Sequence, residues 1–251
     1  LDHPQFSNTS TIFDLLRKAG NPYLFHAAPQ SRVTMDAALK RAQKDLIPPM
    51  GFAFFHIGDL DGTGHTYGPD SMQIRQALSR VDTGLEHLYH LAEKRFTRVH
   101  FILMGDHGMV RVSQHLDIRD TLKKHAVTNG RDCLYLLDST MARFWFKNKQ
   151  TKKKIRSIMS DLPSGRILSQ KDRDRYHLNW PHNRFGDLIF LADPGTLIFP
   201  NHFQNNIPVK GMHGYAPQHH GQQAALLISG PGIPPRHTST PADMRQVFPT
   251  L

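Results

Sequence analysis

The sequence predicts an α/β fold with a mostly parallel central sheet flanked by helices. Two short apolar runs, residues 51–58 (GFAFFHIG) and 99–104 (VHFILM), are typical of strands buried on both faces. Between them, residues 71–96 repeat apolar side chains at helical spacing, as an amphipathic helix does. Strand, helix and strand in this order indicate parallel strands joined by a crossover helix.

Two further helices are expected ahead of the first buried strand. Residues 10–19 carry an apolar face, begin with Ser and Thr that can cap a helix, and are followed by Gly20. Residues 35–47 repeat the helical pattern until Pro48 and Pro49 stop it.

The character of the chain changes between residues 141 and 180. Residues 142–147 alternate like a strand and residues 152–162 look helical, which predicts a small α+β insert or cap. Residues 187–192 and 224–229 then resume the pattern of a buried strand. The sequence thus predicts three parts: a core part at 1–140, the insert at 141–180, and a second core part at 181–251.

Composition limits the class of protein. The 251 residues are 39% hydrophobic and 21% charged, which indicates a packed globular domain. The single cysteine, Cys133, excludes an internal disulfide framework and a cysteine-based zinc finger. The net charge is +10, and we interpret its densest run, residues 147–156, as a solvated helix face in preference to a nucleic-acid site. No apolar stretch approaches the length of a transmembrane helix.

Three short motifs place Asp or His beside glycine: residues 61–65 (DGTGH), 105–109 (GDHGM) and 211–215 (GMHGY). The first two follow predicted strands of the first core part, where ligands of α/β sheets bind, and the third lies in the second core part. Carboxylates and imidazoles suit divalent metal ions, with Zn²⁺ as the natural candidate. The candidate ligands are Asp61, His65, Asp106, His107 and His213.

Neighbouring residues supply weaker candidates. We expect the glycines of the first motif to turn the backbone sharply, so that its Asp and His converge, with Asp59 as a rival ligand. Gly108 is expected to permit a close approach. Singly, each motif is more often a turn or a loop histidine, and only their joint occurrence at strand ends favours a site. Candidate substrate contacts are Tyr67, Tyr215 and His219.

The motifs resemble those of one family. Residues 61–69 (DGTGHTYGP) resemble the D-x-x-G-H-x-x-G-P element of the type I phosphodiesterase/nucleotide pyrophosphatase family, in the alkaline phosphatase superfamily. Residues 106–109 (DHGM) are similar to its D-H-G-M element, and 213–215 with 229–232 resemble its late H-G-Y and G-P-G segments. The resemblance implies an alkaline phosphatase-like fold and hydrolysis of a phosphodiester or nucleotide pyrophosphate.

The same resemblance implies two divalent ions, with Zn²⁺ favoured. Asp61, His65 and His213 would hold one ion, and Asp106 and His107 the other with a further Asp. It also implies a covalent phosphoryl-enzyme formed by a Thr or Ser, which in the family precedes the helix at 10–19 and is not found in this chain. The expected partner is a phosphorylated or nucleotide-like small molecule.

We expect this sequence to be a piece of a longer parent. It starts at Leu1 and ends at Leu251, where residues 248–251 read as the beginning of a closing helix. Thr250 follows Phe-Pro, as the family nucleophile does, but lies at the wrong end of the chain. Without nucleophile and last ligand, the piece alone is expected to turn over poorly. Any targeting signal would lie in the missing segment, and neither compartment nor oligomeric state is predicted.

Several alternatives stay open at this point. A phosphomonoesterase, a phosphonate hydrolase or a sulfatase of the same superfamily would share the ligands, although Cys133 lacks the context that a sulfatase requires. A non-catalytic protein that keeps the fold for binding would also lack the nucleophile. A nucleic-acid binder would use the basic residues 147–156, and its affinity would fall steeply with salt.

Overall fold

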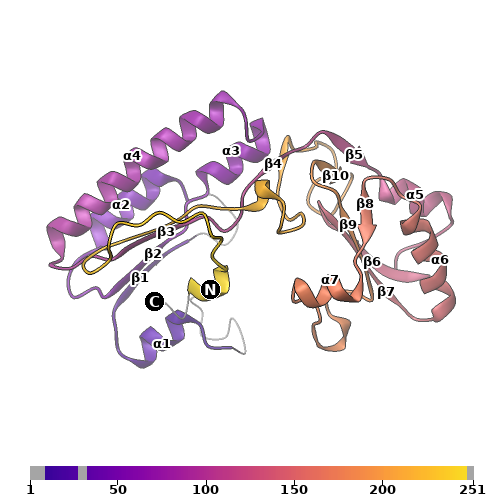
Figure 1. Ribbon diagram of the computed structural model, residues 1–251, viewed down its shortest axis with the longest axis horizontal. Coiled ribbons are helices and arrows are strands. Elements are labelled where there is room, and N and C mark those ends of the chain that lie inside the picture. The colour runs from indigo at the N-terminus through magenta and orange to yellow at the C-terminus, as the bar shows by residue number, and fades with distance from the viewer. Residues whose placement is uncertain (1–8, 28–32, 248–251) are drawn as a thin grey trace. The chain divides into compact units, whose positions relative to one another are not determined.

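Figure 1 shows the protein as a computed structural model that describes residues 9–27 and 33–247. The expected closing helix at 248–251, with Thr250, lies outside the described residues. The chain forms two compact units. The first contains Leu1–Thr63, Met72–Asp106 and Ala224–Leu251, and the second contains Gly64–Ser71 and His107–Gln223. The three-part division at residues 140 and 180 stays a prediction.

The first unit has an α/β arrangement. Strands β1 (Tyr23–His26) and β2 (Phe52–Phe55) pair in parallel, whereas β3 (Phe101–Met104) and β12 (Leu226–Ser229) pair antiparallel. Its helices are α1 (Ile12–Lys18), α2 (Met35–Asp45), α4 (Met72–Arg95) and the first half of α3 (Asp59–Tyr67). A short 3₁₀ turn, η3 (Met244–Gln246), follows β12.

Alternate side chains of β1 and β2 pack on opposite faces, as the apolar run predicts. On one face, Phe13 of α1 lies 5.0 Å from Phe25 and 5.9 Å from Phe54 between ring centroids. On the other face, Leu24 and Ala53 join the cluster formed with α2 and α4. Figure 1 shows α2 and α4 side by side over this face and α1 beyond the other. These strands are therefore covered on both faces.

The predicted long helix is α4, and its buried residues recur at helical spacing: Ala77, Val81, Gly84 and Leu88. At Gly84 a methyl group would overlap the side chain of Met35, so glycine allows α2 to approach α4. Leu78, one of the apolar residues of this helix in the sequence, is 56% exposed.

Two expectations about the sheet need correction. Among the described strands only β1–β2 and β5–β10 pair in parallel, so the ladders are mixed and not mostly parallel. An apolar run reads the same in either direction, and pairing direction therefore cannot be read from it. The run at 224–229 does form a strand, β12, but Leu227 is 51% exposed, so this strand is not buried.

The second unit is built on a four-stranded antiparallel sheet in the order β6-β7-β9-β8. These strands are β6 (Cys133–Leu137), β7 (Met141–Phe146), β9 (Leu188–Ala192) and β8 (Gly165–Ile167). The unit also contains two short ladders: β5 (Gln114–Leu116) with β10 (Thr196–Ile198), and β4 (Val110–Arg111) with β11 (Gly211–Met212). The helices are α5 (Ile118–Lys124), α6 (Lys149–Ser160) and α7 (Gln170–Arg175), with 3₁₀ turns η1 (Pro181–Asn183) and η2 (His220–Gln222).

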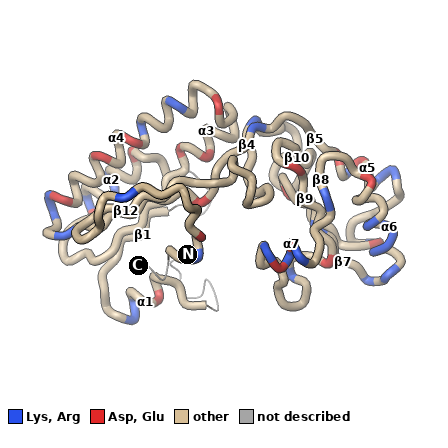
Figure 2. The backbone as a smooth tube through the Cα atoms, viewed as in Figure 1, with Lys and Arg blue, Asp and Glu red and all other residues tan. Residues whose placement is uncertain are grey.

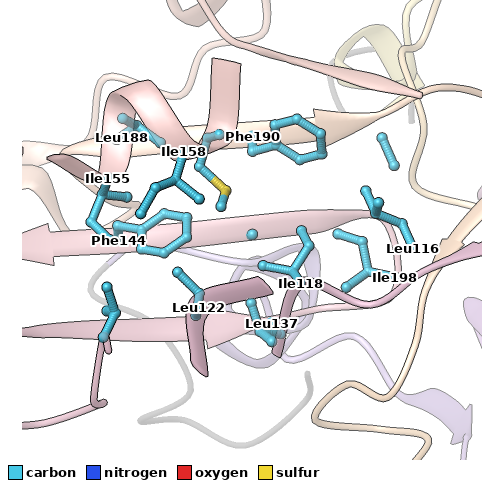
Figure 3. Packing of buried hydrophobic residues seen from close by; sticks show 14 of the residues in the cluster. Leu116, Ile118, Leu122, Leu137, Phe144, Ile155, Ile158, Leu188, Phe190 and Ile198 are labelled. Carbon is cyan, nitrogen blue, oxygen red and sulfur yellow. The ribbon is translucent and has the colours of Figure 1, made fainter. Parts of the chain in front are cut away.

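Helix α6 contains the basic run. Its Ile155, Ile158 and Met159 are buried, and Figure 3 shows Ile155 and Ile158 packed with Phe144 of β7. The lysines at 152–154 are exposed, and Figure 2 shows the basic residues along this helix. The run is thus the polar face of an amphipathic helix, as interpreted from the sequence. No helix within the described residues combines the length and apolarity needed to span a membrane.

Helix α5 ends in a Schellman motif that has alanine where glycine is preferred. The amide of Val127 donates to the carbonyl of Leu122, and the amide of Ala126 donates to that of Lys123, both at 2.9 Å. Ala126 takes a left-handed backbone with φ of 52°. A side chain in this conformation costs about 1–2 kcal/mol relative to the right-handed helix.

We therefore expect Ala126→Gly to raise the free energy of unfolding by about 0.5–1 kcal/mol, because glycine adopts this backbone without strain. Urea denaturation measures the change. Gly130→Ala is the reverse control, since Gly130 has φ of 84° and open space for a methyl group. It should destabilise by about 1 kcal/mol. A destabilised Ala126→Gly variant would contradict the assignment of strain.

A carboxylate holds the start of α7 to β8. Asp172 accepts a bidentate pair from Arg166, at 2.6 and 2.9 Å, and hydrogen bonds from the amide and hydroxyl of Ser169. The Arg166 guanidinium, followed by the Ser169 hydroxyl, holds the pKa of Asp172 well below its usual value of 3.8. The folded state therefore favours the charged carboxylate.

A lowered folded-state pKa contributes stability that is present above the unfolded pKa, about 3.9, and is lost as the pH falls below it. We expect Asp172→Asn to lower the melting temperature at pH 7, and this deficit to shrink as the pH is lowered from 4 to 2. Thermal melts across this range measure it. Asp82→Asn, at an exposed residue of α4, is the control. A deficit independent of pH would show that the charge is not responsible.

Candidate metal centre

The first motif is helical. Residues 61–65 lie inside α3 (Asp59–Tyr67), so the expected sharp turn at the glycines is wrong. The amide of Gly62 donates to the carbonyl of Gly58, and the Thr63 hydroxyl donates to that of Asp59. In a helix, residues four apart lie on one face. Helical spacing therefore brings Asp61 and His65 together.

Asp59, the rival ligand, has a different role. Its carboxylate accepts the backbone amide of Met35, the first residue of α2, at 2.9 Å. Carboxylates are favoured at helix N-termini because the first amides of a helix have no partner within it. We therefore assign Asp59 to the junction of α2 with α3.

Three of the candidate ligands form a group. One ligand atom each from Asp61, His65 and His213 lies within 4.8 Å of the other two. The rings of His65 and His213 are 5.1 Å apart between centroids. Both imidazoles are half-buried, whereas Asp61 is exposed. Asp61 and His65 belong to helix α3, whereas His213 follows β11 and lies 148 positions after His65 in the sequence.

Backbone contacts fix how His65 is presented. Its Nδ1 lies 2.8 Å from the carbonyl oxygen of Gly211, which can only accept, so Nδ1 carries the proton. In the neutral ring, Nε2 then has the lone pair that a metal ligand needs. Metal-binding histidines commonly donate their other nitrogen to a carbonyl in this way.

The second motif leaves the end of β3 in irregular backbone, as predicted. His107 donates from Nδ1 to the carbonyl of Gly108 at 3.0 Å, so its neutral ring also has the lone pair on Nε2. The ring stacks on His213, with centroids 3.6 Å apart and planes at 14°. The second motif therefore places an imidazole beside the third. Asp106 directly precedes His107 in the chain.

The β4–β11 ladder aligns the second and third motifs. It pairs Met212 with Val110 and Gly211 with Arg111, immediately after the second motif and before His213. At Gly211 a methyl group would lie 2.5 Å from the Gly64 carbonyl, and at Gly108 it would overlap the Gly221 carbonyl. The close approach expected at Gly108 is thus real, but it is made to backbone.

Gln222 joins the loops of the last two motifs. Its side-chain oxygen accepts the amides of Gly214 and Tyr215, at 2.7 and 3.0 Å. Its backbone carbonyl accepts the amide of Gly108 at 3.0 Å, and its amide donates to the carbonyl of His219 at 2.8 Å. We call these four bonds the Gln222 junction. It connects the residues next to His107 and His213, and no sequence motif marks it.

We expect Gln222→Leu to lower the free energy of unfolding by about 1 kcal/mol, because two amides lose their acceptor while the side chain keeps its size. Gln222→Glu keeps an acceptor oxygen and should retain most of the stability. Chemical denaturation without metal measures both. Equal loss in the two variants would contradict a role for the acceptor oxygen.

The three weaker candidates for substrate contacts lie in different environments. Tyr215 is a core residue, 4% exposed, whose hydroxyl donates to the carbonyl of Thr196 at 3.1 Å, which corrects its assignment to substrate. Burial raises its pKa well above the usual value. Gly214, at φ of 87°, turns the chain between His213 and this core position. Tyr67 is 46% exposed at the end of α3. His219 caps η2.

Sequence reasoning missed two more residues that hold the loops. The Thr140 hydroxyl, almost fully buried, donates to the carbonyl of Gly214 at 2.8 Å. The amide of Lys210 donates to the carbonyl of His65 at 2.8 Å. A buried threonine at a strand turn is a faint signal, because a buried hydroxyl requires a partner. The Lys210 bond uses backbone alone and leaves no trace in the sequence.

The fold and the clustered Asp and His side chains define an α/β protein with a possible metal-binding triad. The sequence matches the family described as type I phosphodiesterase/nucleotide pyrophosphatase over residues 12–216. Since the match covers most of the chain, the chain belongs to this family.

Curated relatives are similar at moderate identity. The bis(5'-adenosyl)-triphosphatase of Xenopus laevis is 25% identical over 207 residues, covering 80% of this chain and 44% of the relative. Ectonucleotide pyrophosphatase/phosphodiesterase family member 7 of Rattus norvegicus is 24% identical over 230 residues, covering 86% and 49%. The chain thus spans about half the length of these relatives.

Solved structures show the same fold. Murine ectonucleotide pyrophosphatase/phosphodiesterase 5 superposes with a TM-score of 0.71 at 18% identity, covering 87% of this chain and 63% of that one. An inactive variant of it in complex with AMP gives a TM-score of 0.68 at 19% identity, with coverages of 84% and 61%. The alkaline phosphatase-like α/β fold expected from the resemblance is confirmed.

Proposed function

We propose that this chain carries most of the active site of a metal-dependent hydrolase of phosphodiesters or nucleotide pyrophosphates. The observation that carries the proposal is the convergence of His213 with Asp61 and His65, which lie far earlier in the sequence. Membership of the family supports the reaction class. Activity and substrate of the whole protein are part of this proposal, because the chain spans only part of its relatives.

The donor set fits borderline divalent ions. One carboxylate and two imidazoles are ligands that Zn²⁺ accepts, and the proton on Nδ1 of His65 leaves the opposite nitrogen for coordination. Asp61, His65 and His213 would hold one ion. Asp106 and His107 would hold a second with a further Asp, and the stack of His107 on His213 supports adjacent sites. Mn²⁺ and Mg²⁺ remain alternatives to Zn²⁺.

Two adjacent divalent ions would supply Lewis-acid stabilisation of the charge that develops on the attacking and leaving oxygens. The residues of the chain contribute geometry. The Gly211 carbonyl holds the ring of His65, and the Gln222 junction holds the loops of His107 and His213 in register. A ligand set that is already arranged avoids the cost of ordering it during the reaction. In addition to these ligands, the resemblance implies a nucleophilic Thr or Ser.

A nucleotide-like phosphate ester is the substrate class that the relatives favour. One relative is named for cleavage of bis(5'-adenosyl) triphosphate, and a structural neighbour binds AMP. The positive net charge of +10 would raise the local concentration of an anionic substrate. The basic helix α6 is amphipathic and explained by packing, which leaves nucleic acid without a specific observation.

We expect His65→Ala and His213→Ala each to weaken Zn²⁺ binding by at least about tenfold, because each removes a ligand. Isothermal titration with Zn²⁺ measures this, and His237→Ala, in an exposed segment, is the control. In a protein that hydrolyses a nitrophenyl phosphodiester, the same variants and added chelator should abolish that hydrolysis.

The outcomes separate the rival functions. A wild-type chain that binds no Zn²⁺, Mn²⁺ or Mg²⁺ would refute the metal centre. Metal binding without turnover of any phosphodiester would favour a non-catalytic binding protein. Preferred turnover of a phosphomonoester would indicate the sister enzymes of the superfamily.

A further inference from the structure

His219 has the opposite proton arrangement to the candidate ligands. The backbone amide of Gly221 donates to its Nδ1 at 3.1 Å, so Nδ1 must carry a lone pair. The proton of the neutral ring is then on Nε2. His65 and His107 donate from Nδ1 and have the lone pair on Nε2. At its outer nitrogen, His219 is therefore set up as a hydrogen-bond donor and not as a metal ligand.

The Gln222 junction ties His219 to the loops of the metal ligands. The His219 carbonyl accepts the amide of Gln222, whose side chain holds the residues after His213 and whose carbonyl holds Gly108. The amide of His219 donates to Ala216 at 3.0 Å. All of these residues belong to the second unit.

A second brace fixes the chain just before His219. The hydroxyl of Tyr176, at the end of α7, donates to the side chain of Gln218 at 2.8 Å. Tyr176 and Ala216 pack on the same apolar cluster. The His219 side chain is half-buried, in contrast to the exposed His220. The His219 ring is thus restrained at Nδ1, and the chain beside it is held by hydrogen bonds of Gln218 and Gln222.

We propose that His219 is a substrate-binding residue that donates its Nε2 proton to an anionic oxygen of the phosphoryl group. This inference rests on the proposed function. A phosphoryl oxygen accepts hydrogen bonds strongly, and a neutral donor binds it without repelling the cations of the site. A bond to a charged group contributes enough to change affinity by about tenfold or more. No proton leaves His219, so its role is binding and not acid–base catalysis.

Two substitutions test separately the donor at Nε2 and the acceptor at Nδ1 of the His219 ring. His219→Asn carries an oxygen at the position of Nδ1 and can keep the cap on Gly221, but it has no group at Nε2. His219→Gln can carry an amide nitrogen at the position of Nε2, but it loses the acceptor for Gly221. The first variant removes the proposed donor and the second removes the structural acceptor. Folding of each is checked by its thermal melt.

The measurement is binding of inorganic phosphate to the zinc-loaded protein, with Zn²⁺ affinity titrated separately. We expect His219→Asn to bind phosphate about tenfold more weakly with unchanged Zn²⁺ affinity, and His219→Gln to stay within about threefold of wild type. Long-range ¹H–¹⁵N spectra of the wild type should show the His219 proton on Nε2.

Three results would overturn the inference. One is wild-type phosphate affinity in His219→Asn, which would leave His219 with only its capping role. Another is a proton on Nδ1 in the spectra. The third is zinc binding by the wild type without phosphate binding, which would leave the metal centre intact. A wild-type protein that binds no metal would instead sink the proposed function, and the inference with it.

Discussion

The hydrogen bond from His65 Nδ1 to the Gly211 carbonyl is the interaction on which the candidate centre depends. It joins the last turn of α3 to Gly211 of β11, two residues before His213. The contact requires glycine at position 211, because a side chain there would collide with the carbonyl of Gly64. The bond also sets the proton position of His65. This one contact therefore fixes the distance between α3 and β11, the orientation of the His65 ring and the position of its lone pair.

The β4–β11 ladder extends this coupling to the second motif. It is only two residues long, yet it pairs the residues directly after His107 with those directly before His213. Short ladders are weak alone. The Gln222 junction adds four hydrogen bonds, and the stacked rings of His107 and His213 close the arrangement. The histidines gather because hydrogen bonds hold their loops, and these bonds join backbone atoms to one another and to the side chains of His65, Thr140 and Gln222.

This explains which features could be predicted from the sequence. Helix α4, strands β2 and β3 and the identity of the clustered histidines follow from periodicity and motif spacing. The helical state of residues 61–65 could not be predicted, since each glycine disfavours a helix by about 1 kcal/mol. Tertiary contacts outweigh this cost: Asp59 binds the start of α2, and Gly64 packs on Met109. Pairing direction was equally hidden, because it changes no residue type.

The contrast between Tyr215 and His219 shows where motif reasoning stops. Both lie shortly after His213, and residue type alone favours neither as a substrate contact. Gly214 turns Tyr215 into the core, where its hydroxyl has a carbonyl partner. The turn at η2 leaves His219 half-buried with its inner nitrogen occupied by a backbone amide. Histidine can serve as ligand or donor, and the backbone group that meets Nδ1 decides between them. A carbonyl there leaves the outer nitrogen of the neutral ring with the lone pair that a ligand needs, as in His65 and His107, whereas an amide leaves it with the proton of a donor. The same residue type thus acquires two chemistries within one group of loops, and the choice is made by main-chain atoms that no sequence motif encodes.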